Sequence, residues 1–254
     1  FDLGCHWMHS ASLNPFVNIA DKLGIQYQKR IGYGSTHIVS NGVQLKKEDK
    51  ASVEKLLADN SQRMTKLWAE GQDISVMDAL GEDREWASIS DYFTVLETSS
   101  DVDQVSIGDL INYHDTNENW PVIDGYGALI QRWAADVPVA LDTRAKEIHW
   151  GGGTVRVTTT KGDIRASRVI LTVSTSVLSS GAIRFVPGLP ERKKTAIASL
   201  PLGNYNRIRL KISSNAFDKD TPERIIALSA GEPPMALSIR PYNFDCVVGI
   251  VGGR

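Results

Sequence analysis

Apolar residues recur with a helical period through much of the first half of the chain. Asn14-Pro15 is a typical helix start, because Asn caps the first free amides and Pro suits the first helical position. Apolar residues then share one face as far as Gly24, a residue that often ends helices. Residues 48–70 carry a longer apolar stripe with charges opposite, which predicts a second helix. Residues 72–120 predict short helices and loops.

Strand patterns replace helical ones after a helix predicted to open near Gly125. Short segments separated by glycine turns follow in quick succession and indicate a β-meander. Residues 169–173 are apolar without alternation, as in a strand that is covered on both faces. The segments of the predicted meander are 137–141, 144–150, 153–160 and 163–166.

Alternation returns near the C-terminal end. In residues 205–213 three aliphatic side chains face one way and three basic ones the other: Ile208, Leu210 and Ile212 against Arg207, Arg209 and Lys211. Asn41-Gly42 predicts a type I′ hairpin over residues 36–45. A short helix at 191–200 and strands at 224–229, 235–240 and 244–251 complete the pattern. The order of helices, a β-meander and a group of antiparallel strands predicts a mixed α/β (α+β) fold. Its two regions would be interleaved along the sequence.

Composition narrows the class of protein. The 254 residues are 42% hydrophobic and 23% charged, with a net charge of −2, as in an ordinary globular protein. Nucleic-acid binders are usually basic, so no nucleic-acid partner is expected. No apolar run is long enough to span a bilayer, and no signal-peptide pattern opens the chain. Cys5 and Cys246 imply no disulfide framework, and a cytoplasmic location fits.

Local motifs do not identify a chemistry. Gly125 and Gly127 supply two glycines of a dinucleotide-binding G-x-G-x-x-G, but Ile130 occupies the third position. We therefore interpret these two glycines as turn residues in preference to phosphate ligands. Cys5, His6 and His9 lie close together but lack the usual metal-ligand spacing and a fourth ligand, so no metal site is predicted.

Longer stretches, taken in order, carry a resemblance. They include DLGCHW at residues 2–7, DGYGALI at 124–130, the meander followed by VILTVS at 169–174, IRFVPGLP at 183–190 and LPLG at 200–203. Together these resemble the flavin-containing amine oxidases, which include monoamine oxidases, polyamine oxidases and lysine-specific histone demethylases. Bacterial members are more similar to this chain than animal monoamine oxidases are.

The resemblance implies a partial FAD-binding domain with a β-meander, made of residues 1–30 and 121–186. A substrate-binding domain of mixed sheet and helices would comprise 31–120 and 187–254. The chain begins and ends abruptly, and family members carry a G-x-G-x-x-G upstream and another flavin-binding segment downstream. Since these segments supply most of the pyrophosphate contacts, we expect the chain as given to hold no FAD and to be inactive by itself.

The same resemblance implies site residues. Residues that match the family's flavin-adjacent loop would line the cofactor; the alternative is that this loop is a tight turn between packed elements. A residue of the meander would touch the adenine through its backbone. The segment after the apolar strand would also contact the cofactor. Two residues of the first loop would also face the substrate. These positions are Gly4, Cys5, His6 and Trp7 beside the flavin, Ala145 at the adenine, Thr172, Val173 and Ser174 after the strand, and Trp7 with His9 at the substrate.

Arg207 occupies the position at which many amine oxidases have lysine. In the family that lysine holds a water near the flavin N5 and is associated with reoxidation by oxygen. Arginine keeps the charge but is planar and almost never deprotonated. We therefore predict that Arg207 is a catalytic residue and that the complete enzyme uses oxygen poorly as electron acceptor. The alternative is that Arg207, Arg209 and Lys211 form a solvated strand face with the aliphatic residues inside.

The resemblance thus implies an FAD-dependent oxidoreductase that converts a small-molecule amine to an imine at its C–N bond. Two alternatives stay open. The first is a related flavin desaturase or a protoporphyrinogen-oxidase-like enzyme, because one fold serves several reactions. The second is a flavin-free interaction module derived from the same fold.

Overall fold

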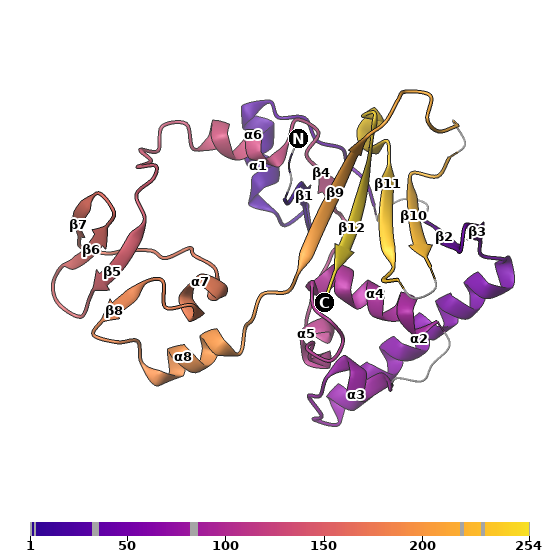
Figure 1. Cartoon of the computed structure of the whole chain (residues 1–254), viewed down its shortest axis with the longest axis horizontal. Coiled ribbons are helices and arrows are strands. Elements are labelled where there is room, and N and C mark those ends of the chain that lie inside the picture. The colour runs from indigo at the N-terminus through magenta and orange to yellow at the C-terminus, as the bar shows by residue number, and fades with distance from the viewer. Residues whose placement is uncertain are drawn as a thin grey trace. The chain divides into compact units, whose positions relative to one another are not determined.

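The computed structural model of the chain describes residues 2, 4–31, 36–81, 86–218, 221–229 and 232–253. The chain forms two compact units: residues 1–136 with 203–254, and residues 137–202. Helices and sheets occur in both (Figure 1), so the predicted mixed α/β fold is confirmed. The functional division into FAD-binding and substrate-binding domains is a separate question and stays a prediction.

A six-stranded sheet is the centre of the larger unit. Its order is β3-β2-β10-β11-β12-β9, with β2 parallel to β10 and the other pairs antiparallel (Figure 1). The last strand, β9, is therefore an edge strand. The bounds are Thr36–Ser40 (β2), Val43–Gln44 (β3), Tyr205–Lys211 (β9), Arg224–Leu228 (β10), Met235–Ile239 (β11) and Cys246–Gly252 (β12).

Helices α2 (Lys47–Ala69) and α4 (Ala87–Thr98) pack against one face of this sheet. The shared core joins Val53 and Tyr92 from the helices to sheet residues such as Ile226 and Ile250. Two short helices, α3 (Val76–Leu80) and α5 (Ile107–Ile111), close a second core at the far end of α2. No described helix combines the length and the apolar composition needed to cross a bilayer.

A third core lies near the N-terminus. It joins α1 (Pro15–Leu23) and α6 (Tyr126–Trp133) to the paired strands β1 (Trp7–Met8) and β4 (Trp120–Pro121). The predicted signals around α1 are confirmed: Asn14 accepts a hydrogen bond from the Phe16 amide, and Gly24 adopts a φ of 65°. The hairpin turn is confirmed as well, since Asn41 and Gly42 both have positive φ. A single 3₁₀ turn, η1 (Pro241–Asn243), precedes β12.

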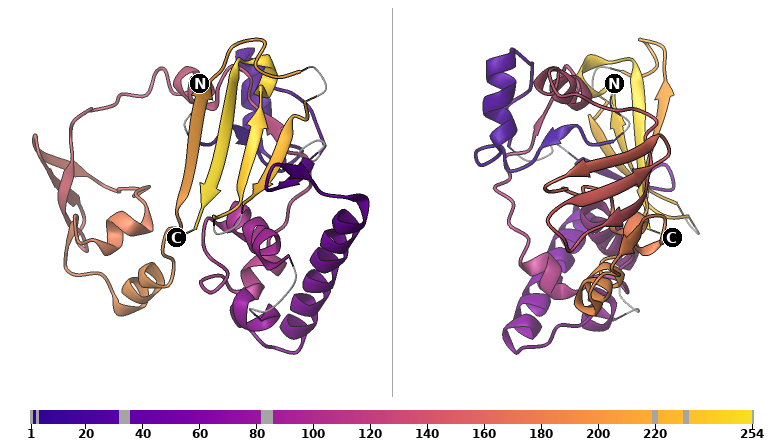
Figure 2. Two further views of the ribbon diagram at one scale, coloured as in Figure 1. Left: turned by 45° about the vertical axis from the view of Figure 1, so that its right-hand side comes forward. Right: turned by 90° about the vertical axis from the view of Figure 1, so that its left-hand side faces the viewer.

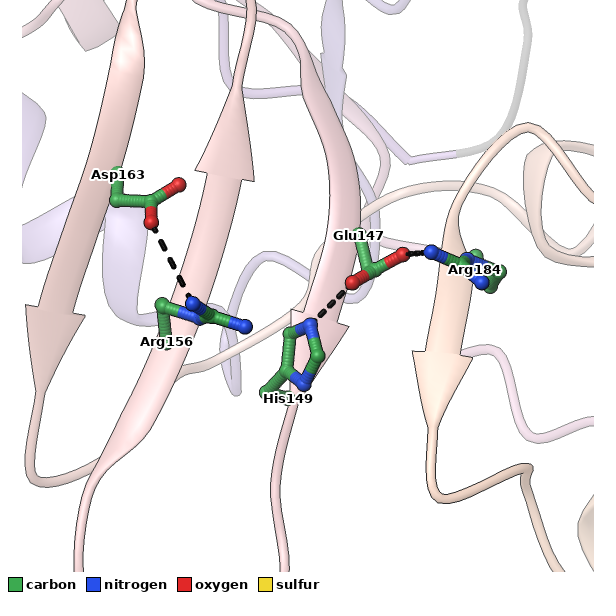
Figure 3. Close-up of polar contacts among 5 residues, drawn as sticks. All are labelled: Glu147, His149, Arg156, Asp163 and Arg184. Atoms are coloured by element: carbon green, nitrogen blue, oxygen red, sulfur yellow. Dashed lines mark hydrogen bonds and ion pairs between the residues drawn. The ribbon is translucent and has the colours of Figure 1, made fainter.

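The smaller unit is built on the predicted meander (Figure 2). Strands β5 (Ala145–His149), β6 (Val155–Thr159) and β7 (Gly162–Ala166) are antiparallel neighbours, and β8 (Arg184–Val186) adds to β5 in parallel. On this sheet the Glu147 carboxylate lies between His149 and Arg184, and Arg156 approaches Asp163 at 3.7 Å (Figure 3). Helices α7 (Thr175–Ser179) and α8 (Glu191–Ala198) complete the unit.

Two strand predictions in the smaller unit are wrong. Residues 137–141 and 169–173 belong to no strand, and their aliphatic side chains are exposed, with Ile170 88% accessible. A strand needs backbone hydrogen-bond partners as well as apolar side chains. Neither segment pairs with any strand that the structure describes. Apolar sequence alone was therefore insufficient to place these segments in a sheet.

Candidate active site

Arg207 lies on the face of the large sheet that carries the core. In the register of β9 with β12, Arg207 is opposite Ile250 and Arg209 is opposite Val248, and both of these partners belong to the hydrophobic core. Residues that are opposite in an antiparallel pair share a face. The neighbouring Ile208 and Leu210 point the other way and are 47% and 59% exposed. The interpretation of the arginines as a solvated face is therefore wrong for Arg207 and Arg209, which are half-buried.

The N-terminal loop explains this inversion. Arg207 Nη1 donates to the carbonyl oxygen of Gly4 at 2.7 Å, and Arg209 Nη2 donates to the carbonyl oxygen of Asp2 at the same distance. Loop carbonyls that face a sheet need donors, and the two guanidinium groups supply them. Leu3, between these two carbonyls, lies outside the described residues. The structure thus brings Arg207 together with the loop that the resemblance places beside the flavin.

His6 contacts Arg207 from the same loop. Arg207 Nη1 lies 2.7 Å from His6 Nδ1, and Nη2 lies 3.3 Å from Nε2. Since a guanidinium can only donate, the shorter contact assigns the acceptor lone pair to Nδ1 and the ring proton to Nε2. Burial, followed by the charge of Arg207, lowers the pKa of His6 to about 3. His6 is therefore a neutral hydrogen-bond acceptor at physiological pH.

Aromatic side chains surround this pair. The ring centroid of His6 is 5.0 Å from that of Trp7 and 6.4 Å from that of Tyr242, and the Arg30 guanidinium carbon lies 5.7 Å from the Trp7 ring. Burial is the main cause of a lowered pKa for Arg207 and of a Tyr242 pKa raised to about 12. A half-buried cation, a neutral imidazole and aromatic rings together suit a flat, electron-poor or anionic ligand.

The predicted site residues of the smaller unit have structural contacts of their own. Ala145 is half-buried at the start of β5, opposite Thr159. Thr172 and Val173 are exposed and precede α7. Ser174 is the N-cap of that helix and accepts a hydrogen bond from the Val177 amide at 3.3 Å.

His9, a predicted substrate residue, belongs to the larger unit. Nδ1 of this exposed histidine is 2.7 Å from Oδ1 of the buried Asn119. The roles of these residues toward cofactor or substrate stay predictions.

Comparison with known proteins decides the family. The sequence model of the family described as "Flavin containing amine oxidoreductase" matches residues 78–249, more than half of the chain. The chain belongs to the flavin-containing amine oxidoreductases. Its resemblance to amine oxidases is therefore confirmed. The full-length members of this family are oxidoreductases that use FAD.

The chain spans only part of the length of the relatives that it matches. Human lysine-specific histone demethylase 2 is 36% identical over 95 residues, which are 37% of this chain and 12% of that protein. Polyamine oxidase 1 of Oryza sativa subsp. japonica is 29% identical over 169 residues, 59% of this chain and 32% of that protein. The structure of cyclohexylamine oxidase from Brevibacterium oxydans IH-35A matches 100% of this chain and 64% of its own, with a TM-score of 0.72 and 17% identity.

The N-terminal loop leaves open space at Gly4, whereas the start of α6 is occupied by a side chain. A Cβ built on Gly4 would meet nothing within 4 Å, so this exposed position leaves room for a ring to approach. The N-terminus of α6, in contrast, is occupied by the chain itself. The Asp2 carboxylate accepts from the Tyr126 amide at 2.5 Å and the Gly127 amide at 2.9 Å. These amides are the anion-binding groups of that helix, and Asp2 occupies them, while the Gly125 amide donates to the Val122 carbonyl oxygen.

Sequence reasoning missed three features of the site. The Arg207–His6 pair joins residues 201 positions apart, and Asp2 caps a helix 124 residues away. Tyr242 offered no signal beyond its aromatic ring, although its positive φ of 56° marks an unusual turn.

Among the residues that the structure describes, no group of His, Cys, Asp and Glu side chains could hold a metal ion.

Proposed function

We propose that the full-length protein is an FAD-dependent oxidoreductase that oxidises a small-molecule amine to an imine at its C–N bond. The observation that carries the proposal is the approach of Arg207 to Gly4 and His6. It joins the residue at the family's lysine position to the loop at the family's flavin-adjacent position. The curated relatives and solved structures that match are named as polyamine oxidase, histone demethylase and cyclohexylamine oxidase, which supports an amine as substrate.

In this proposal the chain positions the reactants, and FAD would supply the redox chemistry by taking the hydride equivalent from the carbon beside the amine. Gly4, Cys5, His6 and Trp7 would lie against the flavin ring, and Ala145 with Thr172, Val173 and Ser174 would contact other parts of the cofactor. Arg207 holds a fixed positive charge beside the loop. Trp7 and His9 would face the amine. Residues 1–30 with 121–186 would form part of the FAD-binding domain, and 31–120 with 187–254 the substrate-binding domain.

The test is a flavin spectrum followed by an amine panel. The purified full-length protein should show the flavin absorption band, and anaerobic addition of an amine substrate should bleach it while an imine-derived aldehyde or ketone appears. A flavin that is bleached by a C–C substrate and by no amine would favour a desaturase. A colourless full-length protein that gains no flavin on reconstitution would favour an interaction module. The chain as given, tested alongside, is expected to bind no FAD and to show no activity.

A further inference from the structure

We propose that Arg207 is a carboxylate-binding residue, so that the amine oxidised by this protein also carries a carboxylate. The inference rests on the proposed function, which leaves the class of amine open. It is drawn from the hydrogen bonding of the guanidinium group, the charges around it and the turn that lies beside it.

The hydrogen bonds of Arg207 leave its binding edge unused. Both protons of Nη1 are engaged, by the Gly4 carbonyl oxygen and by His6 Nδ1, each at 2.7 Å. Among the described residues Nη2 faces only His6 Nε2, at 3.3 Å, and this nitrogen carries the ring proton and cannot accept. Nε is buried and has no hydrogen-bond partner among the described residues. Nε–H and Nη2–H lie on the same edge of the guanidinium, and this edge pairs with the two oxygens of a carboxylate.

The charge of Arg207 is also uncompensated. In the described part of the chain no carboxylate lies within ion-pair distance of it. The Asp2 carboxylate, on the same loop, is bound to the amides at the start of α6. Two more cations are close to the loop: Arg209 donates to the Asp2 carbonyl, and Arg30 lies over the Trp7 ring. A half-buried cation that lacks an anion is costly, so an anionic ligand is strongly favoured here.

A turn with unfavourable backbone angles lies beside His6 and Arg207. Nε is shielded in the present arrangement, so a carboxylate has to displace a neighbour. Arg240, Tyr242 and Asn243 have φ values of 45°, 56° and 64°, which are unfavourable for residues with side chains. Residues with such backbone angles cluster at active sites and ligand clamps. The Tyr242 hydroxyl interacts electrostatically with Arg207 and stays protonated, so it can donate a further hydrogen bond to the carboxylate.

The experiment compares amines that differ only in the carboxylate. Phenylalanine is paired with phenethylamine, and 6-aminohexanoate with pentylamine, in anaerobic flavin reduction by the full-length flavoprotein. Benzoate, which cannot be oxidised, is titrated separately against the flavin spectrum. We expect the carboxylate-bearing member of at least one pair to reduce the flavin about tenfold or more faster at low concentration, and benzoate to perturb the spectrum.

Variants then locate the effect. Arg207→Gln should lower the preference within the pair by roughly 10- to 100-fold and remove the benzoate shift, and Arg207→Lys should retain part of both because it keeps the charge without the fork. Lys211→Gln removes an exposed charge from the same strand face and should change neither. The inference is overturned if both members of each pair react equally in the wild type, or if Arg207→Gln slows both members equally. A benzoate shift that disappears in Arg207→Gln, without bleaching by any amine, would support the site while refuting the proposed function.

Discussion

Arg207 and His6 constrain one another at the scale of single residues. The guanidinium needs an acceptor, and His6 can provide one only while it is neutral. Burial and the nearby cation keep it so, with a pKa of about 3. In return His6 and the Gly4 carbonyl fix the plane of the guanidinium. A lysine at this position would carry the same charge as a mobile point and could lose a proton on burial, whereas arginine does neither.

Oxygen use is the first consequence of that difference. We predict that Arg207→Lys raises the rate at which the reduced full-length enzyme consumes oxygen by about tenfold or more, because a lysine can bind water and shift its pKa where arginine cannot. An oxygen electrode, with an artificial acceptor assayed in parallel, measures both reactions. Each acceptor is added to enzyme that has already been reduced, so that a weaker carboxylate contact in the variant does not enter the rate, and reoxidation by the artificial acceptor should change little. Equal oxygen rates in wild type and variant would contradict the role of Arg207.

His6 gives a pH dependence to the stability. Its pKa is about 3 when folded against a model value of 6.5, so the unfolded chain binds more protons between these values. The resulting stability is complete above pH 6.5 and is lost as the pH falls toward 3. We expect the free energy of unfolding to drop by about 2 kcal/mol from this group between pH 7.5 and 5.

Urea denaturation at several pH values measures this drop. His6→Gln, which keeps an acceptor but does not titrate, should flatten the profile over that range. His114→Gln, which removes an exposed histidine away from this site, is the matched control and should retain the wild-type slope. If His6→Gln and wild type lose stability in parallel, His6 is not the group responsible.

The position of Arg207 was predictable from the resemblance, but its partners were not. An alternating strand pattern indicates that two faces differ and does not say which one is inside. The usual assignment, with aliphatic residues inside, fails here because β9 is an edge strand whose core-side face meets loop carbonyls. Knowing that required the loop and the strand, some 200 residues apart, to be seen together.

At the scale of helices and strands, signals confined to a few residues predicted the structure best. Asn14 and Gly24 set the ends of α1, and Asn41-Gly42 forms the hairpin turn, because caps and turns depend on local backbone geometry. The start of α6 was also predicted, yet its cap comes from Asp2 at the other end of the sequence. Local patterns thus located the elements, and long-range polar contacts hold them together.

Tyr92 is such a contact between a helix and the large sheet. From α4, its hydroxyl accepts from the Ala236 amide at 2.5 Å and donates to the Ile250 carbonyl at 2.6 Å, with the side chain 3% exposed. Tyr92→Phe leaves two buried backbone groups without this partner, so we expect a loss of about 2–3 kcal/mol in the free energy of unfolding. Tyr113→Phe, at a residue 56% exposed, should change it by less than about 0.5 kcal/mol. Equal effects of the two substitutions in urea denaturation would contradict a bridging role for Tyr92.

At the scale of the whole molecule, the smaller unit has an unusual surface. Residues 169–173 have the composition of a central strand, yet Val169, Ile170, Leu171 and Val173 are all at least 37% exposed and the segment pairs with no described strand. Soluble proteins rarely leave a contiguous apolar segment uncovered without a partner for it. The three relatives named above are longer than this chain. We infer that this segment is covered in the full-length protein.

Ile170→Asp tests this inference. In the chain as given, the side chain is 88% exposed, so the substitution should alter the free energy of unfolding by less than about 0.5 kcal/mol. In the full-length protein the same aspartate would be buried without a partner and should cost several kcal/mol, roughly 3 or more. Ile148→Asp, at a residue 4% exposed in β5, should destabilise both forms and shows that the smaller unit reports damage in either. If Ile170→Asp is equally harmless in the two forms, residues 169–173 remain on the surface of the complete protein, and the apolar run needs another explanation than a covered strand.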